Sequence, residues 1–170
     1  MKIDIKKAIP EDAQGFTDCF ISCWQSAYRE IVPKEYLENM LMEREQILSR
    51  NINSLKNPGN CEYFCVKDNR KMIGFIIINF CQNENKSCIG EIWAIYLIEE
   101  YCNKGYGKIL LEFAINKLKK VKQEKIYLWV FEDNNRARKF YEKNNFEYNG
   151  EKREMNYGKP LTQLKYVFKE

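Results

Sequence analysis

The sequence of 170 residues contains no histidine. Histidine is the side chain that most often serves as a general base near neutral pH, and it is the commonest zinc ligand. Any proton transfer by this protein must therefore use Glu, Asp, Tyr, Lys, Cys, a chain terminus or water. We predict no metal site, because no histidine or third thiol completes one around Cys19 and Cys23 or around Cys61 and Cys65. We interpret these four cysteines as packing residues.

Long apolar runs are also missing. No run approaches the roughly 20 residues that a bilayer span requires, so we expect no membrane partner. The start of the chain, residues 1–4, leads into a strand pattern and not into the apolar centre of a signal peptide. The seven cysteines are an odd number without a Cys-x-x-Cys pair, which is typical of reduced thiols. These features predict a cytoplasmic protein.

The sequence shows no internal repeat, no low-complexity tract and no linker-like stretch of Pro, Gly and Ser. Its 45% apolar and 31% charged residues are typical of a globular chain. We therefore predict one domain spanning 1–170. The net charge of +4 is modest, and we interpret the lysine cluster at 117–122 as a solvated helix face. A nucleic-acid partner would need a basic stripe interleaved with exposed aromatic residues, so we expect none.

Hydrophobic periodicity predicts an α/β fold in which a mixed sheet carries helices on both faces. The strands expected from the pattern are 3–8, 63–66, 72–80, 88–97, 126–131 and 163–168. The helices expected are 10–31, 37–55, 107–121 and 135–143, and a polar stretch follows the last of them. The predicted order of elements is β-α-α-β-β-β-α-β-α-β-β, with two strands after the last helix, of which only 163–168 is assigned a range.

One segment indicates a phosphate site. The strand 91–97 leads into a short loop that contains Gly105 and Gly107, and an amphipathic helix follows. Glycines allow positive φ and close backbone approach, and the free amides and dipole of a helix start attract anions. Two glycines alone are weak evidence, since such a pair also makes an ordinary tight turn. A Walker loop and a dinucleotide fingerprint are both excluded by the spacing.

Segment 95–111 resembles the acetyl-CoA motif of the GNAT family of N-acetyltransferases, with Cys102 at the usual Gln/Arg position. Segment 134–146 is similar to the second block of that family, with Asn145 in place of a glycine. The resemblance extends to 73–75 and to 24–33, which resembles a broad bacterial group with a Trp-x-x-x-Tyr first helix. It implies the GNAT fold, with six or seven strands flanked by about four helices, and the use of acetyl-CoA.

The resemblance also implies roles for individual residues. Tyr141 matches the general acid of the family, and Asn134 matches a residue that contacts the pantetheine arm. Main-chain groups at 95–97 are expected to bind the pantetheine and the acetyl carbonyl. The residues expected to bind the cofactor are Ile95, Tyr96, Leu97, Cys102, Asn103, Lys104, Gly105, Tyr106, Gly107, Lys108, Asn134 and Tyr141.

The catalytic base is predicted to be Glu91, because several GNAT enzymes carry a glutamate on this strand. The alternative is a merely solvated glutamate at a strand end. Ribosomal-protein acetyltransferases place a glutamate on the following strand, where Trp129 stands here. Trp24, Tyr28 and Trp93 are predicted to bind the substrate, since aromatic rings pack apolar bodies and attract ammonium groups. Trp24 fits a core position equally well.

The sequence therefore predicts an acetyl-CoA-dependent N-acetyltransferase that acts on a primary amine of a small molecule by direct attack in a ternary complex. Three alternatives stay open: a non-catalytic acyl-CoA-binding or regulatory module, a protein N-terminal acetyltransferase, and a lysine acetyltransferase. A homodimer through the C-terminal strands is also possible.

Overall fold

The computed structural model describes residues 3–82, 88–121 and 125–170. Within these residues the strands are β1 (Ile3–Lys7), β2 (Cys61–Asp68), β3 (Lys71–Gln82), β4 (Cys88–Leu97), β5 (Lys125–Phe131), β6 (Phe146–Asn156) and β7 (Pro160–Phe168). The helices are α1 (Ala13–Ala27), α2 (Lys34–Met42), α3 (Arg44–Lys56), α4 (Tyr106–Lys120) and α5 (Asn135–Glu142). Two 3₁₀ turns, η1 (Pro10–Asp12) and η2 (Glu99–Tyr101), precede α1 and α4. None of the helices in the described ranges is long and apolar enough to cross a membrane.

The predicted α/β class and element order are confirmed, with one helix more than expected. The predicted helix 37–55 is divided into α2 and α3 at Glu43, whose ψ of 12° lies outside the helical region. No Gly or Pro marks this break. The bend lets both short helices bury their apolar residues, among them Leu37 and Ile47, against the same cluster. The polar stretch after the last predicted helix forms β6, an edge strand whose side chains are mostly exposed.

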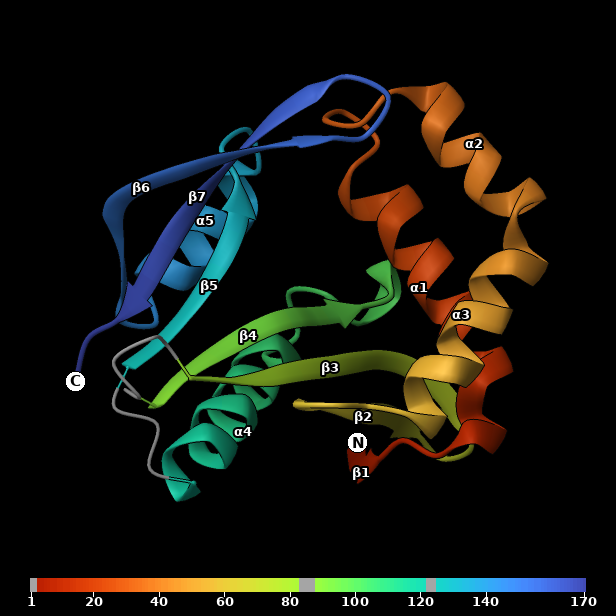
Figure 1. Ribbon diagram of the computed structural model, residues 1–170, viewed down its shortest axis with the longest axis horizontal. Helices are drawn as coiled ribbons and strands as arrows, with labels where there is room; N and C mark the ends of the chain where they lie inside the picture. Colours follow the sequence, from red (N-terminus) through yellow and green to blue (C-terminus); the bar gives the residue numbers. More distant parts are fainter. Residues whose placement is uncertain (1–2, 83–87, 122–124) are drawn as a thin grey trace.

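One seven-stranded sheet runs through the described residues in the order β1-β2-β3-β4-β5-β7-β6. Helices α4 and α5 lie on one face, and α1, α2 and α3 lie on the other, around the N-terminal half of the sheet (Figure 1). The core on the α4 face contains Ile92 and Leu110, and the core on the α1 face contains Phe16 and Phe75. On the α1 face, the C-terminal half of the sheet packs against the helices only at the end that carries Phe131 and Leu161 (Figure 1).

Strands β4 and β5 separate soon after they begin to pair. They are parallel, and only three residue pairs join them, from Ile89↔Lys125 to Glu91↔Tyr127. Beyond that point β4 stays paired with β3, and β5 stays paired with β7. The two strands consequently diverge and leave a gap in the middle of the sheet (Figure 1).

A β-bulge at Trp93 changes which side chains of β4 face each layer. Ile77 pairs with Ala94 and Ile78 pairs with Ile92, so Trp93 has no partner in the register. Ile92 and Ile95 contact the α4-side core, whereas Ala94 and Tyr96 contact the α1-side core. Trp93 itself is 56% exposed.

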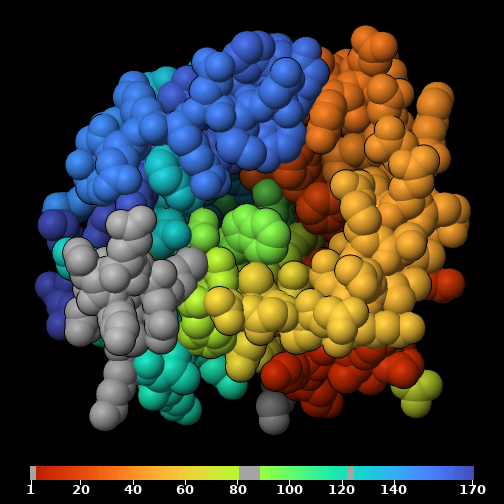
Figure 2. Space-filling model, viewed as in Figure 1, coloured from red at the N-terminus to blue at the C-terminus, as the bar shows by residue number. Residues whose placement is uncertain are grey.

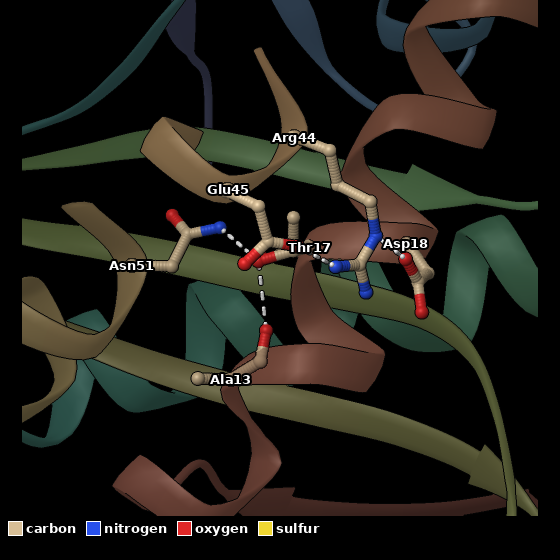
Figure 3. Close-up of polar contacts among 6 residues, drawn as sticks. All are labelled: Ala13, Thr17, Asp18, Arg44, Glu45 and Asn51. Atoms are coloured by element: carbon tan, nitrogen blue, oxygen red, sulfur yellow. Dashed lines mark hydrogen bonds and ion pairs between the residues drawn. The ribbon is translucent and has the colours of Figure 1, made fainter. Parts of the chain in front are cut away.

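Helix α1 is attached to α3 by polar contacts (Figure 3). The hydroxyl of Thr17 donates to the Ala13 carbonyl at 2.8 Å and accepts from the Asn51 amide at 2.9 Å. Arg44 donates to the Asp18 carboxylate at 2.8 Å. These contacts fix the position of α1, whose C-terminal end reaches the gap between β4 and β5.

The turn between β6 and β7 reaches across to the helices. Gly158, with φ of 83°, lies against Pro33 and Tyr36, and the Tyr157 ring packs on Trp24 and Phe131. The two halves of the sheet are thereby bridged above the gap. Figure 2 shows a hollow at this place, with green β4 recessed between the blue β6–β7 segment and the red-to-orange helices. We call this hollow the acceptor hollow.

Candidate active site

The loop before α4 presents a helix start without a side-chain cap. Gly105 is the N-cap residue with φ of 84°, and Asn103 also has a positive φ of 59°. A Cβ atom added to Gly105 would meet nothing within 4 Å, so the space in front of this turn is open. The first turn of a helix leaves backbone amides without intrahelical partners, an arrangement that binds phosphate groups, although the Lys108 amide already donates to the Gly105 carbonyl oxygen at 3.2 Å.

The amide of Cys102 is not among these free donors, since it already donates to the Glu99 carbonyl oxygen at 3.0 Å. Positive side chains surround the turn instead. Lys104 lies over the Tyr101 ring at 5.7 Å, and Lys108 is only loosely paired with Glu112 at 3.8 Å. Cations at a helix start oppose the helix dipole unless an anion binds there, so the turn favours an anionic ligand.

Tyr141 lies on α5, where its ring packs against Phe140 and Phe146. Burial raises the pKa of Tyr141 to about 12, and no neighbouring cation lowers it. The hydroxyl is therefore protonated at neutral pH and can donate a hydrogen bond or a proton. Burial is the main cause that raises the pKa values of Tyr28 and Tyr96, and Tyr141 raises both by a smaller amount. Tyr28 caps the C-terminal end of α1, whereas Tyr141 lies on α5, on the opposite face of the sheet.

Tyr28 and Tyr96 form a pair at the α1 side of the gap. Their hydroxyl oxygens are 2.6 Å apart, and the Tyr28 ring packs edge-on against Phe131 of β5. Burial raises the pKa of both tyrosines, so neither is ionised near neutral pH. Since one hydroxyl proton is used between the two residues, the pair retains one proton that can be donated to a ligand.

Glu91 belongs to the last residue pair that joins β4 and β5, at the point where the two strands begin to diverge. It is 9% exposed, and it accepts a hydrogen bond from the Tyr127 hydroxyl at 3.2 Å. Its neighbours Gly90 and Ile92 face α4, so the alternation of the strand turns Glu91 to the α1 side. A buried carboxylate with one weak donor is not the solvated strand-end residue of the alternative interpretation.

The remaining predicted residues are placed as follows. Asn134 is the N-cap of α5, and its Oδ1 accepts from the Ala137 amide at 3.1 Å, which leaves the amide nitrogen of its side chain outside this cap. Trp24 packs on Phe20, Tyr28 and Tyr157, and its buried indole N–H has no hydrogen-bond partner in the described residues. Trp93 projects from the bulge of β4 and is exposed.

Comparison with known proteins decides the class of this site. The model of the acetyltransferase (GNAT) family matches residues 17–146, which include the α4 turn, Glu91 and Tyr141. The chain belongs to this family. A spermidine N(1)-acetyltransferase of Thermoplasma acidophilum is 29% identical over 150 residues, 86% of this chain and 89% of that protein. An uncharacterized N-acetyltransferase of Bacillus subtilis is 29% identical over 133 residues, 78% of this chain and 73% of that protein.

The fold leads to the same family. The crystal structure of the PaiA N-acetyltransferase of Thermoplasma acidophilum in complex with coenzyme A matches all of this chain and all of that chain. The TM-score is 0.75, and the sequences are 25% identical. The chain is thus an acetyltransferase with the GNAT fold, and its family implies the use of acetyl-CoA.

The structure adds candidate residues, of which the sequence had drawn attention only to Trp129. Tyr127 and Trp129 alternate with buried residues along β5, and the buried Phe131 contacts Tyr28. Arg153 of β6 contacts Trp129, and Tyr157 of the following turn contacts Phe131. The period-2 pattern of 126–131 was hidden in a continuous apolar run. The roles of Arg153 and Tyr157 depend on the pairing of β6 with β7, which no local signal indicates.

The pairs of cysteines pack as predicted. The thiols of Cys19 and Cys23 are 3.9 Å apart inside α1, and Cys65 is buried on β2. In the described ranges no group of three or more Cys, Asp or Glu side chains could hold a metal ion.

Proposed function

We propose that this protein transfers the acetyl group of acetyl-CoA to a primary amine of a small molecule, by direct attack in a ternary complex. The observation that carries the proposal is the gap between β4 and β5, which Glu91 borders at the last residue pair and which Tyr28 spans by contacting Tyr96 of β4 and Phe131 of β5. Hydroxyl donors and a carboxylate at this gap are the groups that aminolysis of a thioester requires.

Acetyl-CoA fits the loop before α4. Its pyrophosphate would accept hydrogen bonds from the amides of residues 103–107, near the side chains of Lys104 and Lys108, while the Cys102 thiol faces the carbonyl oxygens of Leu97 and Ile98 at 3.7 Å. Main-chain groups of Ile95, Tyr96 and Leu97 are assigned to the pantetheine arm, because β4 has no partner on its β5 side beyond Glu91. The side chain of Asn134 is assigned to the same arm. When bound, acetyl-CoA supplies an activated acetyl thioester.

Tyr141 is the proposed acid and Glu91 the proposed base. The amine nitrogen attacks the thioester carbon, the carbon–sulfur bond breaks, and the sulfur takes a proton or a strong hydrogen bond from Tyr141. Glu91 removes the extra proton of the amine, directly or through water. Tyr28 and Tyr96 hold their remaining hydroxyl proton at the mouth of the gap, where it can bind an oxygen of the acetyl group or of the acceptor.

The acceptor is proposed to enter the acceptor hollow, between Trp93, Tyr28 and the β6–β7 turn. The Thermoplasma acidophilum and Bacillus subtilis relatives named as spermidine and spermine/spermidine acetyltransferases support a small amine. The turn of β6 and β7 packs on the helices, and this closure also favours a small molecule over a folded protein.

Calorimetric titration with acetyl-CoA, followed by a thiol-release assay with a panel of amines, tests the proposal. Micromolar binding and thiol release with at least one small amine are expected. Binding of acetyl-CoA without thiol release in the presence of any amine, peptide or protein would favour a non-catalytic acyl-CoA-binding module over an enzyme. Absence of binding would refute the cofactor assignment.

A further inference from the structure

The wall of the acceptor hollow formed by β5 is a ladder of aromatic side chains. Ile126, Leu128 and Val130 face the α4-side core, so the alternate residues Tyr127, Trp129 and Phe131 face the other way. Tyr127 contacts Glu91 and Phe131 contacts Tyr28, so both ends of the ladder touch residues of the proposed reaction centre. Trp129 lies between them.

Arg153 of β6 lies on this ladder. Its guanidinium is 4.3 Å from the centre of the Trp129 ring, and its Nε donates to the side-chain oxygen of Gln163 at 2.7 Å. Gln163 is buried and is paired with both Phe131 and Arg153 across the strands. An arginine that stacks on an indole and is held by a neutral amide is fixed in position, and its two terminal NH₂ groups remain to bind a ligand.

The guanidinium of Arg153 has no carboxylate partner in the part of the chain that the structure describes. Among the described residues no carboxylate forms an ion pair with it, whereas the neighbouring cation Lys165 is paired with Glu151 at 2.9 Å. Lys152, the residue before Arg153, is paired with Glu132 at 2.7 Å. Arg153 is thus the cation of this wall that a ligand can neutralise, and a fixed guanidinium prefers a planar or tetrahedral oxyanion.

The position of Arg153 relates it to the reaction centre. Tyr127 contacts Glu91, and the Trp129 ring contacts the Arg153 guanidinium. The two aromatic residues are two positions apart on β5, which corresponds to a rise of about 7 Å along the strand. Arg153 lies on β6, the strand that leads directly into the turn of Tyr157 and Gly158 that closes the hollow. A small acceptor with its amine at Glu91 would carry its other end toward Arg153.

We propose that Arg153 binds an anionic group of the acceptor, so that the substrate is an amine that also carries a carboxylate or phosphonate-like oxyanion. This inference rests on the proposed function and narrows its substrate class. It distinguishes the protein from its polyamine-acetylating relatives, because a second ammonium group of a polyamine would lie against an unpaired guanidinium.

The test compares acceptors that differ only at the far end. Diamines, ω-amino carboxylates and ω-aminoalkylphosphonates of two to six carbons are assayed by thiol release at saturating acetyl-CoA. We expect kcat/KM of the best anionic amine to exceed that of the matched diamine at least tenfold. Arg153→Gln should remove this preference by raising KM for the anionic amine, while Arg153→Lys should keep part of it. Lys152→Gln, on the opposite side of the same strand, is the control and should change nothing.

The outcomes separate this inference from the proposed function. Turnover of diamines in preference to the matched anionic amines would overturn the role of Arg153 and leave the acetyltransferase activity intact. The same conclusion would follow if Arg153→Gln left the ratio unchanged, or altered only the oligomeric state seen by size exclusion. Failure of every amine to release thiol would remove the proposed function and this inference with it. A preference for carboxylates over phosphonates, or the reverse, would identify the oxyanion.

Discussion

Tyr141 illustrates how burial sets the role of a single side chain. With a pKa raised to about 12, its hydroxyl is a weaker acid than a thiol of pKa near 8.5 by about 3.5 units. Complete proton transfer to a free thiolate would therefore be uphill by about 5 kcal/mol. A hydrogen bond to the charge that develops on sulfur is the larger contribution, and it needs no ionisation of the tyrosine.

Tyr141→Phe should lower kcat by about 10²- to 10³-fold, because one preorganised donor to the leaving sulfur is lost. The acetyl-CoA dissociation constant should hardly change, since the ring still packs on Phe140 and Phe146. Titration of the tyrosine lies near pH 12 in the wild type, so the ratio of the two activities should be constant between pH 6 and 10. Tyr148→Phe, on the exposed edge strand, serves as the control. Equal kcat in Tyr141→Phe and the wild type would remove Tyr141 from the mechanism.

Candidate site residues that lie inside a contiguous motif could be singled out from the sequence. Candidates that depend on contacts between strands could not. Tyr141 and Glu91 are set by the resemblance of their segments and by their place on an element. Arg153, in contrast, is one of many charged residues in a polar stretch. Its contact with Trp129 requires β6 to pair with β7 and β7 with β5, and that pairing depends on the whole sheet.

Among the elements, the turn before α4 has a glycine with positive φ next to the proposed pyrophosphate site. Gly105 and Gly59 both have positive φ, and an added Cβ would meet nothing within 4 Å at either site. A β-branched residue is disfavoured there by its own backbone, at a cost of about 1–2 kcal/mol. The two glycines are thus equivalent in strain, but only Gly105 borders the proposed pyrophosphate site.

Gly105→Val and Gly59→Val should lower the free energy of unfolding by similar amounts, about 1–2 kcal/mol, as measured by urea denaturation. Only Gly105→Val should also weaken acetyl-CoA binding, by tenfold or more in calorimetry, because the side chain displaces amides from the phosphate. Unchanged acetyl-CoA affinity in Gly105→Val would show that the pyrophosphate binds elsewhere.

The start of α1 is attached to β2 by an ion pair that makes stability depend on pH. Burial raises the pKa of Asp12, but hydrogen bonds from Lys67, at 2.7 Å, and from the Ile9 amide outweigh it and hold the pKa below the ordinary 3.8. A carboxylate with a depressed folded pKa stabilises the protein above its unfolded pKa. This stabilisation is lost as the pH falls through the folded value.

Asp12→Asn should therefore lower the free energy of unfolding by about 1 kcal/mol at pH 7, a value that allows for partial solvent screening of the pair. The difference from the wild type should shrink below pH 4 and vanish as Asp12 becomes protonated. Thermal unfolding of both proteins between pH 3 and 7 measures it. A difference independent of pH would mean that the ion pair with Lys67 contributes nothing.

Helix and strand types followed from periodicity, whereas boundaries and edges did not. The expected helix 37–55 has a continuous apolar side, so its division at Glu43 depends on packing against α1 and has no local signal. Strand β6 was left as a polar stretch because an edge strand with both faces largely exposed has no alternation of apolar residues.

Across the whole molecule, the acceptor hollow exists because two halves of one sheet diverge and are bridged again by the β6–β7 turn. Tyr157 is the centre of this bridge, since its ring contacts Trp24, Tyr36 and Phe131 from three different segments. The residues of the proposed cofactor site are local to β4, α4 and α5, so motifs in the sequence could single them out. The residues of the proposed acceptor site come from distant segments, which no local motif connects.

Tyr157→Ala should open the acceptor hollow and raise KM for the acceptor at least tenfold, with little change in acetyl-CoA affinity, because the α4 turn lies outside this cluster. The lost ring contacts should also lower the free energy of unfolding by about 2–4 kcal/mol. Tyr157→Phe keeps the ring and should behave like the wild type, which separates packing from any role of the hydroxyl. Steady-state kinetics at 25 °C, with urea denaturation as the check on folding, measures both effects. An unchanged KM in a folded Tyr157→Ala protein would show that the acceptor does not bind beneath the β6–β7 turn, and the acceptor site would then have to lie nearer the exposed Trp93 at the open end of the gap.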